Sequence, residues 1–305
     1  KGFEAGFQAA QRVAAALEPA QASVALEPTT QHGRRLFERI LRELPVPAHY
    51  FAVEGVRRLL DYQDAPCANL YLDRLATIHA LDQDRGDWHL TRETARYLAL
   101  WMSYEDTIRV AGLKVRGTRV ARVRRDARAG ANEIVGITEF MHPRPREFCE
   151  TLPRVIGRPL LKSHVAQRAL GPLFRKGRFI ETTNVSGFLM LSFIASLRRW
   201  RRLTVRFAEE DARISTWLET VRSTAETDPA TALEIVRCQR LIKGYGDTFD
   251  RGLATFDAIM AKYREIAGSP GAAAEVRAMR EAALGSAMDA PEPLPARAHP
   301  HGQRK

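Results

Sequence analysis

Residues 228–268 read DPATALEIVRCQRLIKGYGDTFDRGLATFDAIMAKYREIAG, and this stretch decides the fold. Asp228 before Pro229 is a strong helix start, because an N-cap acid precedes a proline at the first helical position. The first helix is expected to stop at Gly244, and a second begins near residue 247 or 248. Apolar residues of the second helix recur on one face: Phe249, Leu253, Phe256, Met260 and Tyr263.

The same apolar periodicity extends outward along most of the chain and predicts further helices. One is expected over residues 91–110, with Thr91 as its N-cap and Trp101 and Met102 facing inward. The remaining predicted helices cover residues 50–62, 70–80, 119–128, 145–152, 210–221 and 272–284. The pattern therefore indicates a mainly α fold.

Only a few short segments look like strands. Residues 134–141, IVGITEFM, are the best strand candidate, because branched residues are enriched and Pro143 closes the run. The longest apolar run, VSGFLMLSFIASL at residues 185–197, is shorter than the roughly 20 residues that span a bilayer. It is expected to be buried, as a hairpin strand or as a core helix.

The chain divides into three segments. Residues 1–24 are interpreted as the remnant of a preceding domain and its connector, because the chain opens with Lys1 on a pattern typical of a helix already under way. Residues 25–268 form a helical domain. Residues 269–305 form a helical extension and a tail, rich in Pro, His and Arg, that is expected to be disordered.

The composition restricts the chemistry. The formal net charge is +11, which suggests an acidic partner such as nucleic acid, a membrane surface or an acidic protein. A surface rich in arginine for no binding purpose explains the charge as well. The three cysteines lie far apart and form no CxxC, so a four-cysteine iron–sulfur cluster cannot form within the chain. This cysteine usage fits a cytoplasmic protein.

Arginines gather in two clusters, at residues 116–128 and at residues 198–206, RRWRRLTVR. Guanidinium groups suit phosphates, and Trp200 can stack on a base. No helix-turn-helix, zinc finger or RNA-binding aromatic motif accompanies them. A docking face for an acidic electron carrier or a neighbouring subunit fits equally well.

The loop between the two helices of residues 228–268 is a candidate ligand site. Gly244 and Gly246 permit positive φ, and helix amides near Lys243 and Arg251 can hold a phosphate or carboxylate. The spacing matches neither GxxxxGK[ST] nor GxGxxG, so a plain helix–helix turn is the favoured interpretation. An ion-pair network is then expected among Arg237, Arg240, Asp247 and Arg251.

Two further clusters of charged residues are candidates for acid–base chemistry or for metal binding. Glu105 and Arg109 have i, i+4 spacing, so a surface pair is favoured over acid–base chemistry by Glu105 and Asp106. Glu139 and His142, with Glu147, lack a metal-ligand spacing such as HExxH. No catalytic or metal-binding residue is assigned.

Four blocks of sequence together resemble one known family. They are EGVRRLLDYQDAPCANLYLDRL at residues 54–75, YLALWMSYEDTIRVAGLK at 97–114, ITEFMHPRPREFCETLPRVIGR at 137–158 and CQRLIKGYGDTFDRG at 238–252. In this order they resemble the C-terminal region of the beta subunit of indolepyruvate (arylpyruvate) ferredoxin oxidoreductases, which also occurs inside fused 2-oxoacid oxidoreductases. The opening KGFEAGFQAA resembles the last helix of the gamma-type domain that precedes this region.

The resemblance implies an accessory region without catalytic residues of its own. Thiamine diphosphate, Mg and the iron–sulfur clusters are implied in the catalytic alpha subunit or fused domains, with ferredoxin or another acidic carrier as acceptor. Neither membrane nor nucleic acid is expected as a partner. The residues that mark family membership are Tyr104, Glu105, Asp106, Arg109, Lys114, Glu139, His142, Arg240 and Asp247.

Overall fold

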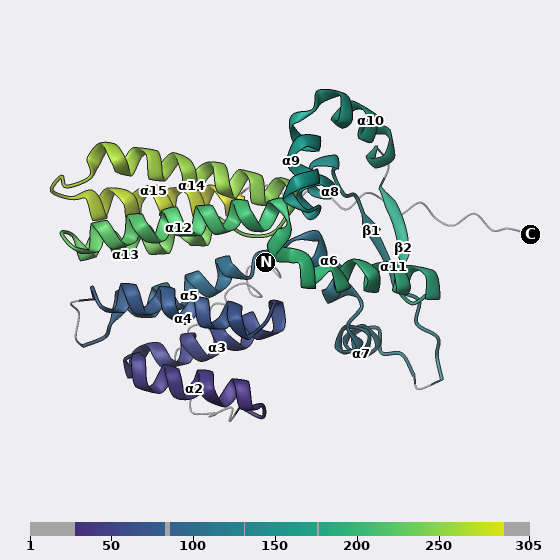
Figure 1. The fold of residues 1–305 in the computed structure, drawn as a ribbon, viewed down its shortest axis with the longest axis horizontal. Coiled ribbons are helices and arrows are strands. Elements are labelled where there is room, and N and C mark those ends of the chain that lie inside the picture. The colour runs from purple at the N-terminus through teal and green to yellow at the C-terminus, as the bar shows by residue number, and fades with distance from the viewer. Residues whose placement is uncertain (1–27, 83–85, 131, 176, 290–305) are drawn as a thin grey trace, which may run out of the picture.

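The computed structural model describes residues 28–82, 86–130, 132–175 and 177–289. The mainly α prediction is confirmed, because helices dominate these residues and the described strands form one two-stranded sheet. The expected remnant over residues 1–24 and the expected tail beyond residue 289 lie outside the described residues. Figure 1 shows a bundle of long helices beside a looser group of short helices and a hairpin.

The N-terminal helices form one side of the bundle. Local capping sets where two of them begin: the Thr30 side chain accepts from the Gly33 amide at 3.1 Å, and Asp64 accepts from the Cys67 amide at 3.0 Å. These helices are α2 (Gln31–Glu43), α3 (Val46–Tyr62), α4 (Ala65–His79) and α5 (His89–Met102).

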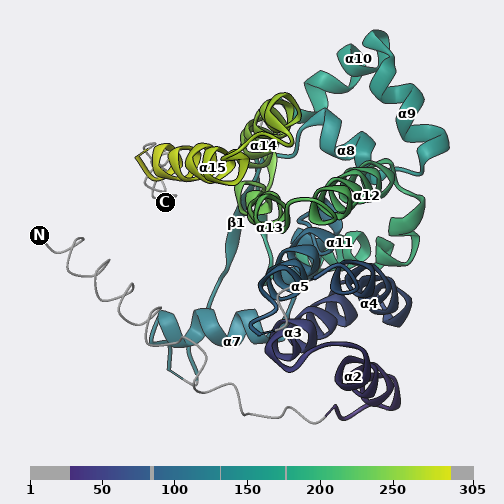
Figure 2. The same ribbon diagram turned by 90° about the vertical axis from the view of Figure 1, so that its left-hand side faces the viewer.

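The C-terminal helices form the other side. The predicted start at Asp228 is confirmed, since its carboxylate accepts from the Thr231 amide at 3.0 Å. The bundle is seen partly end-on in Figure 2. Its C-terminal helices are α12 (Val205–Ala225), α13 (Pro229–Cys238), α14 (Gly246–Ile266) and α15 (Ala272–Asp289), with the short 3-10 helix η2 (Gln239–Leu241) between α13 and α14.

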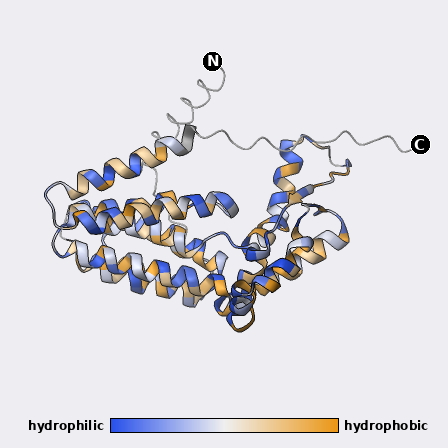
Figure 3. Cartoon of the chain, turned by 90° about the horizontal axis from the view of Figure 1, so that it is seen from above, coloured by the Kyte–Doolittle hydropathy of each residue, from blue (hydrophilic) through white to orange (hydrophobic). Residues whose placement is uncertain are grey.

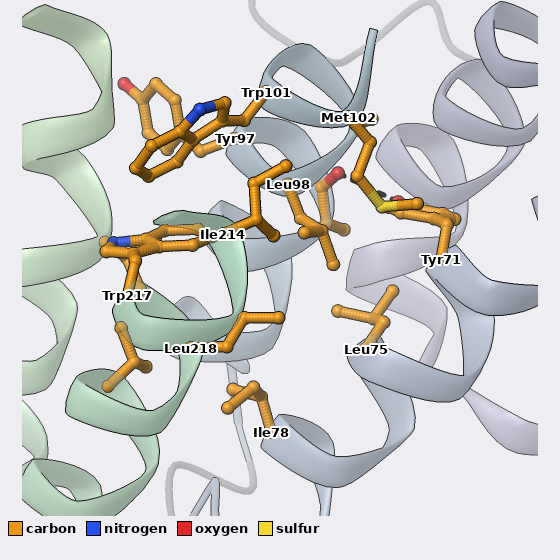
Figure 4. Packing of buried hydrophobic residues seen from close by; sticks show 14 of the residues in the cluster. Tyr71, Leu75, Ile78, Tyr97, Leu98, Trp101, Met102, Ile214, Trp217 and Leu218 are labelled. Carbon is orange, nitrogen blue, oxygen red and sulfur yellow. Dashed lines mark hydrogen bonds between the residues drawn. The ribbon is translucent and has the colours of Figure 1, made fainter. Parts of the chain in front are cut away.

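A single hydrophobic core joins the two sides. The Trp101 ring of α5 lies 5.3 Å from Trp217 of α12 and 5.4 Å from Phe256 of α14, measured between ring centroids. Figure 4 shows Leu98 and Ile214 packed between these indoles and α4. In Figure 3 the bundle helices alternate hydrophobic and hydrophilic residues, as amphipathic helices around a shared core must.

The looser part of the structure lies between α5 and α12 in the chain. Strands β1 (Thr138–Met141) and β2 (Arg178–Glu181) pair antiparallel, with Thr138 opposite Glu181. The apolar helix α11 (Val185–Ser196) packs against α6. The other elements are α6 (Thr107–Lys114), α7 (Gly117–Asp126), α8 (Pro145–Thr151), α9 (Arg154–Lys162), α10 (His164–Phe174) and the 3-10 helix η1 (Leu197–Leu203).

The single helix predicted over residues 91–110 is wrong. Helix α5 ends at Met102, and α6 starts afresh at Thr107, where Asp106 caps it by accepting from the Arg109 amide at 2.6 Å. Thr91 is not the N-cap of α5 but a buried residue whose amide and hydroxyl donate to Asp82. The polar caps outweigh a continuous apolar pattern here.

The helix expected to continue as far as Gly244 is also shorter than predicted. It leaves α-geometry at Cys238, and residues 239–241 tighten into η2. In α14, Gly252 packs on this turn, and a Cβ placed there would lie 2.3 Å from the Leu241 carbonyl oxygen. Helix α15 packs against α13 with Val276 fully buried, so the helical body continues beyond residue 268.

The core predicts a contrast between two leucines on α5. Leu98→Ala is expected to lower the free energy of unfolding by about 2–5 kcal/mol, because Leu98 is fully buried and its loss leaves a cavity. Leu100→Ala, two residues along the same helix and 38% exposed, serves as the control and should cost less than about 1 kcal/mol. Denaturant titration measures both, and equal losses would contradict this arrangement of the core.

Candidate functional site

The family-motif residue Asp106 forms a buried ion pair with Arg201 of η1. The Arg201 Nε donates to Asp106 Oδ2 at 2.7 Å, and its Nη2 donates to Oδ1 at 3.2 Å. Both side chains are buried, at 1% and 8% exposure. Because Asp106 also caps α6, one carboxylate fixes both the ion pair and the start of that helix.

Arg201 also holds the end of α3. Its Nη1 donates to the Tyr62 carbonyl oxygen at 2.9 Å and to Gln63 Oε1 at 2.7 Å, and its guanidinium lies 4.1 Å from the Tyr62 ring centroid. Burial, followed by the nearby Asp106 carboxylate, raises the pKa of both Tyr62 and Tyr104. Both phenols therefore stay neutral, and motif residue Tyr104 packs edge-on to Tyr62.

A second buried carboxylate, Glu210 of α12, continues this network into the bundle. It accepts from Trp101 Nε1 at 2.9 Å and from Arg213 Nη1 at 2.8 Å, and Arg206 lies 3.2 Å away. Arg206 in turn reaches Glu150 of α8 at 3.3 Å. The junction between the bundle and the looser part is thus built of ion pairs with few solvent-exposed atoms.

The predicted pair of Glu105 and Arg109 is wrong. Arg109 instead donates to Asp61 Oδ2 of α3 at 2.9 Å, and Arg116 donates to the same carboxylate at 2.8 Å. The helix break before Thr107 removes the i, i+4 relation on which the prediction rested. The pKa of Asp61 lies below its usual value. Burial by itself would raise this pKa, but the hydrogen bonds from Arg116 and Arg109 lower it by more. Any stability that Asp61 adds is therefore present above its unfolded pKa and is lost as pH falls.

The motif residues Lys114 and Glu139 meet, and His142 does not join them. Lys114 and Arg119 both form salt bridges with the Glu139 carboxylate. His142 Nε2 lies 3.0 Å from the Phe174 carbonyl oxygen instead. Glu147 pairs with Arg144, so the three possible metal ligands from residues 139–147 do not converge. Within the described ranges, no cluster of three or more ligand-type side chains suits a metal ion.

The glycine loop has the geometry of a turn. Gly244 and Gly246 take positive φ of 73° and 60°, as predicted for a loop that only glycine enters freely. Arg144 lies at the start of α14, where its Nη1 contacts Asp247 at 2.8 Å and Asp250 at 3.0 Å. Two carboxylates at this helix end disfavour a bound anion.

The ion-pair network predicted around this loop is wrong. Arg237 pairs with the buried Glu234 of its own helix at 2.9 Å, and Asp247 pairs with Arg144. Arg240 and the candidate Lys243 are exposed on the turn, and Arg251 is exposed on α14. The predicted residues therefore share a region but not a network.

The cysteines are buried free thiols. Burial raises the pKa of Cys67 to about 11 and that of Cys238 to about 12, so both stay protonated at neutral pH. Cys149 is also a buried free cysteine. None of the helices in the described part of the chain combines the length and apolarity that crossing a bilayer requires.

The sequence profile of a family of unknown function, DUF6537, matches residues 48–262. The chain belongs to the DUF6537 family. All four blocks on which the oxidoreductase resemblance rests fall inside this match. No curated protein and no solved structure matches the chain.

Within this DUF6537 chain, the most unusual surface is on α11. The helix contains no charged residue, and it buries only Gly187 and Leu191. We call its exposed large hydrophobic residues the α11 surface. They are Val185 (73% exposed), Phe188 (45%), Leu189 (60%), Met190 (42%) and Phe193 (66%).

Four of these five residues lie on one side of the helix. Val185, Phe188, Leu189 and Phe193 follow i, i+3, i+4, i+8 spacing, which places their side chains along a single stripe. The opposite side is held close to β2, since a Cβ at Gly187 would lie 2.1 Å from the Glu181 carbonyl oxygen. The stripe therefore points away from the fold.

The expectation that residues 185–197 are buried is wrong within this chain. Most of the segment is a helix, as one of the two alternatives held, but five of its large apolar side chains are exposed. A run with no polar face normally predicts burial. The sequence therefore reveals the segment but not that the described residues of the chain leave most of its large apolar side chains exposed.

The buried ion pair predicts a large effect at one arginine. Arg201→Gln is expected to lower the free energy of unfolding by about 3–5 kcal/mol, because it leaves Asp106 buried without its partner cation. Arg199→Gln is the matched control on the same 3-10 helix, where the side chain is exposed, and should change stability by less than about 0.5 kcal/mol. Thermal unfolding measures both variants, and equal melting temperatures would refute the buried ion pair between Arg201 and Asp106.

Proposed function

We propose that this chain is an accessory, non-catalytic region of a thiamine-diphosphate-dependent indolepyruvate-type 2-oxoacid:ferredoxin oxidoreductase. It packs through the α11 surface against the catalytic alpha subunit or a fused catalytic domain. The α11 surface is the single observation that carries the proposal, because an uncharged helix with an exposed apolar stripe marks an interface. The four resembling blocks support the choice of partner.

Neighbouring segments extend the same apolar character. The Phe140 and Phe179 rings of the hairpin lie 5.2 Å apart, and both side chains are more than half exposed. Trp200 and Leu203 of η1, which follows α11 directly, are also more than half exposed. Such a distribution is typical of an interface whose core is aromatic and poor in charge.

The proposal places the chemistry elsewhere. Thiamine diphosphate, Mg and the iron–sulfur clusters would belong to the catalytic subunit or domain, in the cytoplasm. The positive charge of this chain would help an acidic electron carrier such as ferredoxin to dock, since charge complementarity speeds encounter. The isolated chain should not turn over arylpyruvate, and turnover by it would contradict the non-catalytic assignment.

The proposal predicts that two aromatic substitutions release the catalytic partner. Affinity purification of the tagged intact gene product from its own cells should recover a thiamine-diphosphate and iron–sulfur subunit, or one large fused chain. The double variant Phe188→Ser/Phe193→Ser should reduce recovery of a separate catalytic subunit by about tenfold or more, because buried aromatic anchors dominate interface energies. In a fused chain, the same variant should expose the junction to limited proteolysis.

A matched control exists on the N-terminal helices of the bundle. Leu41 and Val46 are 50% and 77% exposed on α2 and α3, so Leu41→Ser/Val46→Ser removes comparable exposed apolar area. This control should retain the partner. Loss of the partner in both double variants, or in neither, would remove the α11 surface from the proposal.

A nucleic-acid-binding module is the second candidate, and the arginine clusters motivate it. The structure offers these arginines protein partners: Arg116 contacts Asp61, Arg119 contacts Glu139, Arg201 contacts Asp106 and Arg202 contacts Asp64. Their charge is therefore partly neutralised inside the fold. This arrangement favours the accessory role.

The nucleic-acid alternative predicts a steep salt dependence. If it held, affinity for a duplex or single-stranded oligonucleotide would fall by orders of magnitude between low and physiological salt, because counterions are released on binding. The accessory role predicts no measurable oligonucleotide binding even at low salt. Fluorescence anisotropy over a salt series measures the difference.

A further inference from the structure

An open pocket lies between α3, α5 and α6, and Arg109 and Arg116 are the residues of its wall that the sequence had already singled out. Its volume is about 620 Å³, which falls within the range of small-molecule sites. Phe51, Gly55, Ala99 and Leu100 supply an apolar part of the wall. Figure 2 shows α3 and α5, the two helices that supply these four residues, side by side.

Two small residues, Gly55 and Ala99, allow α3 and α5 to lie close together beneath the pocket. At Gly55, α3 passes so close to α5 that an added Cβ would lie 2.9 Å from the Ala99 Cβ. The same Cβ would lie 2.7 Å from the hydroxyl oxygen of Tyr71, which is held by donating to the Ala95 carbonyl oxygen at 2.8 Å. The floor is therefore a fixed contact between helices, and the volume above it stays open.

The rest of the wall is strongly basic. Two carboxylates, Glu54 and Asp61, face five arginines, which leaves an excess of three positive charges around the pocket. The arginines come from α3, α5, α6 and the start of α7, and they line one pocket. They are Arg57, Arg58, Arg96, Arg109 and Arg116.

Three of the five arginines have carboxylate partners in the fold. Arg57 pairs with Glu54 at 2.9 Å, while Arg109 and Arg116 share the single carboxylate of Asp61. These pairs position the guanidinium groups but do not neutralise all of them. A structural role for the ion pairs explains these three residues without a ligand.

The other two arginines have no such explanation. In the described part of the chain, neither Arg58 nor Arg96 forms a salt bridge with a carboxylate. Arg58 donates to the Ser103 hydroxyl, and the Arg96 guanidinium lies 5.3 Å from the Tyr97 ring centroid and 5.9 Å from that of Phe51. Stacking on rings leaves the in-plane N–H donors of a guanidinium free for an anion.

Arg58 is in an electrostatically unfavourable position. Burial, followed by the positive charge of Arg109, lowers the pKa of Arg58, although Glu105 and Asp61 act in the opposite direction. Glu105 is close enough to influence Arg58 but forms no salt bridge with it within the described residues. A bound anion would relieve the repulsion between the two guanidinium groups.

We propose that this pocket binds a phosphorylated small molecule that carries a flat apolar group. The phosphate is held by the free donors of Arg58 and Arg96, one from each of two helices, and planar guanidinium forks match phosphate oxygens in bidentate geometry. The flat group lies against Phe51 and Leu100. A charge of −2 to −3 on the ligand offsets the excess positive charge of the wall.

Phosphate is favoured over a single carboxylate by this charge excess, and a small molecule over nucleic acid by the shape. A carboxylate brings one negative charge, which does not balance the two positive charges of Arg58 and Arg96. Arg109 and Arg116 add one further positive charge, because they share the single carboxylate of Asp61. A concave wall with an apolar floor encloses a ligand more fully than it follows a polymer backbone. The inference does not depend on the proposed partner, because binding is measured on the protein alone.

Titration calorimetry on the intact protein tests the proposal with three probes: inorganic pyrophosphate, adenosine diphosphate and adenosine. Adenosine diphosphate should bind most tightly, pyrophosphate more weakly, and adenosine not measurably, since the phosphates carry the recognition. Arg58→Gln and Arg96→Gln should each weaken adenosine diphosphate binding by about tenfold, the loss expected for one charged hydrogen-bonding partner.

The controls separate a built site from general basicity. Arg222→Gln removes an exposed arginine on α12 and should leave binding unchanged. Arg58→Lys keeps the charge without the planar fork and should fall between the parent protein and Arg58→Gln. Each variant must melt like the parent, and Arg96→Gln, which breaks no hydrogen bond in the described structure, keeps the test valid if Arg58→Gln fails to fold.

Three outcomes overturn the proposal. Absence of binding by both phosphorylated probes removes the site. Equal affinity in the parent and in the Arg58→Gln and Arg96→Gln variants assigns the binding to the general positive surface. Binding of an oligonucleotide without binding of pyrophosphate replaces the small-molecule site with the nucleic-acid alternative.

Discussion

The buried ion pair between Arg201 and Asp106 is the constraint on which the rest of the structure depends. A guanidinium at 1% exposure is costly unless every donor has a partner, and Asp106, Gln63 and the Tyr62 carbonyl oxygen provide the partners. These groups come from the end of α3, the start of α6 and η1. The pair thereby fixes where α5 stops, where α6 begins, and how η1 connects α11 with α12.

The two parts joined at this point differ in how completely they bury their apolar residues. The bundle closes around Leu98, Trp101, Trp217 and their neighbours, so each of its helices has a covered face. The looser part packs α11 against α6 and β2 but leaves its apolar stripe outward. Described residues that enclose one core and leave one apolar stripe of α11 exposed suit a role in a larger assembly.

Some of the fold was accessible from sequence because its causes are local. The N-cap of Asp228 followed by Pro229 gave the start of α13, and the apolar spacing of residues 249–263 gave α14. The break at residues 103–106 was missed because the apolar pattern runs through it, while the cap at Asp106 is stabilised by an arginine 95 residues away. The arginine pocket was missed as well, since its basic residues come from separate helices.

The sequence by itself determined the helical character and the starts of α8, α13, α14 and α15, because periodicity and capping act over a few residues. Tertiary structure alone decided which charge meets which. Arg109 meets Asp61 instead of Glu105, Asp247 meets Arg144, and Arg58 is left without a carboxylate within the described residues. Long side chains reach whatever the packing of distant helices brings near, and the spacing along one helix does not encode that choice.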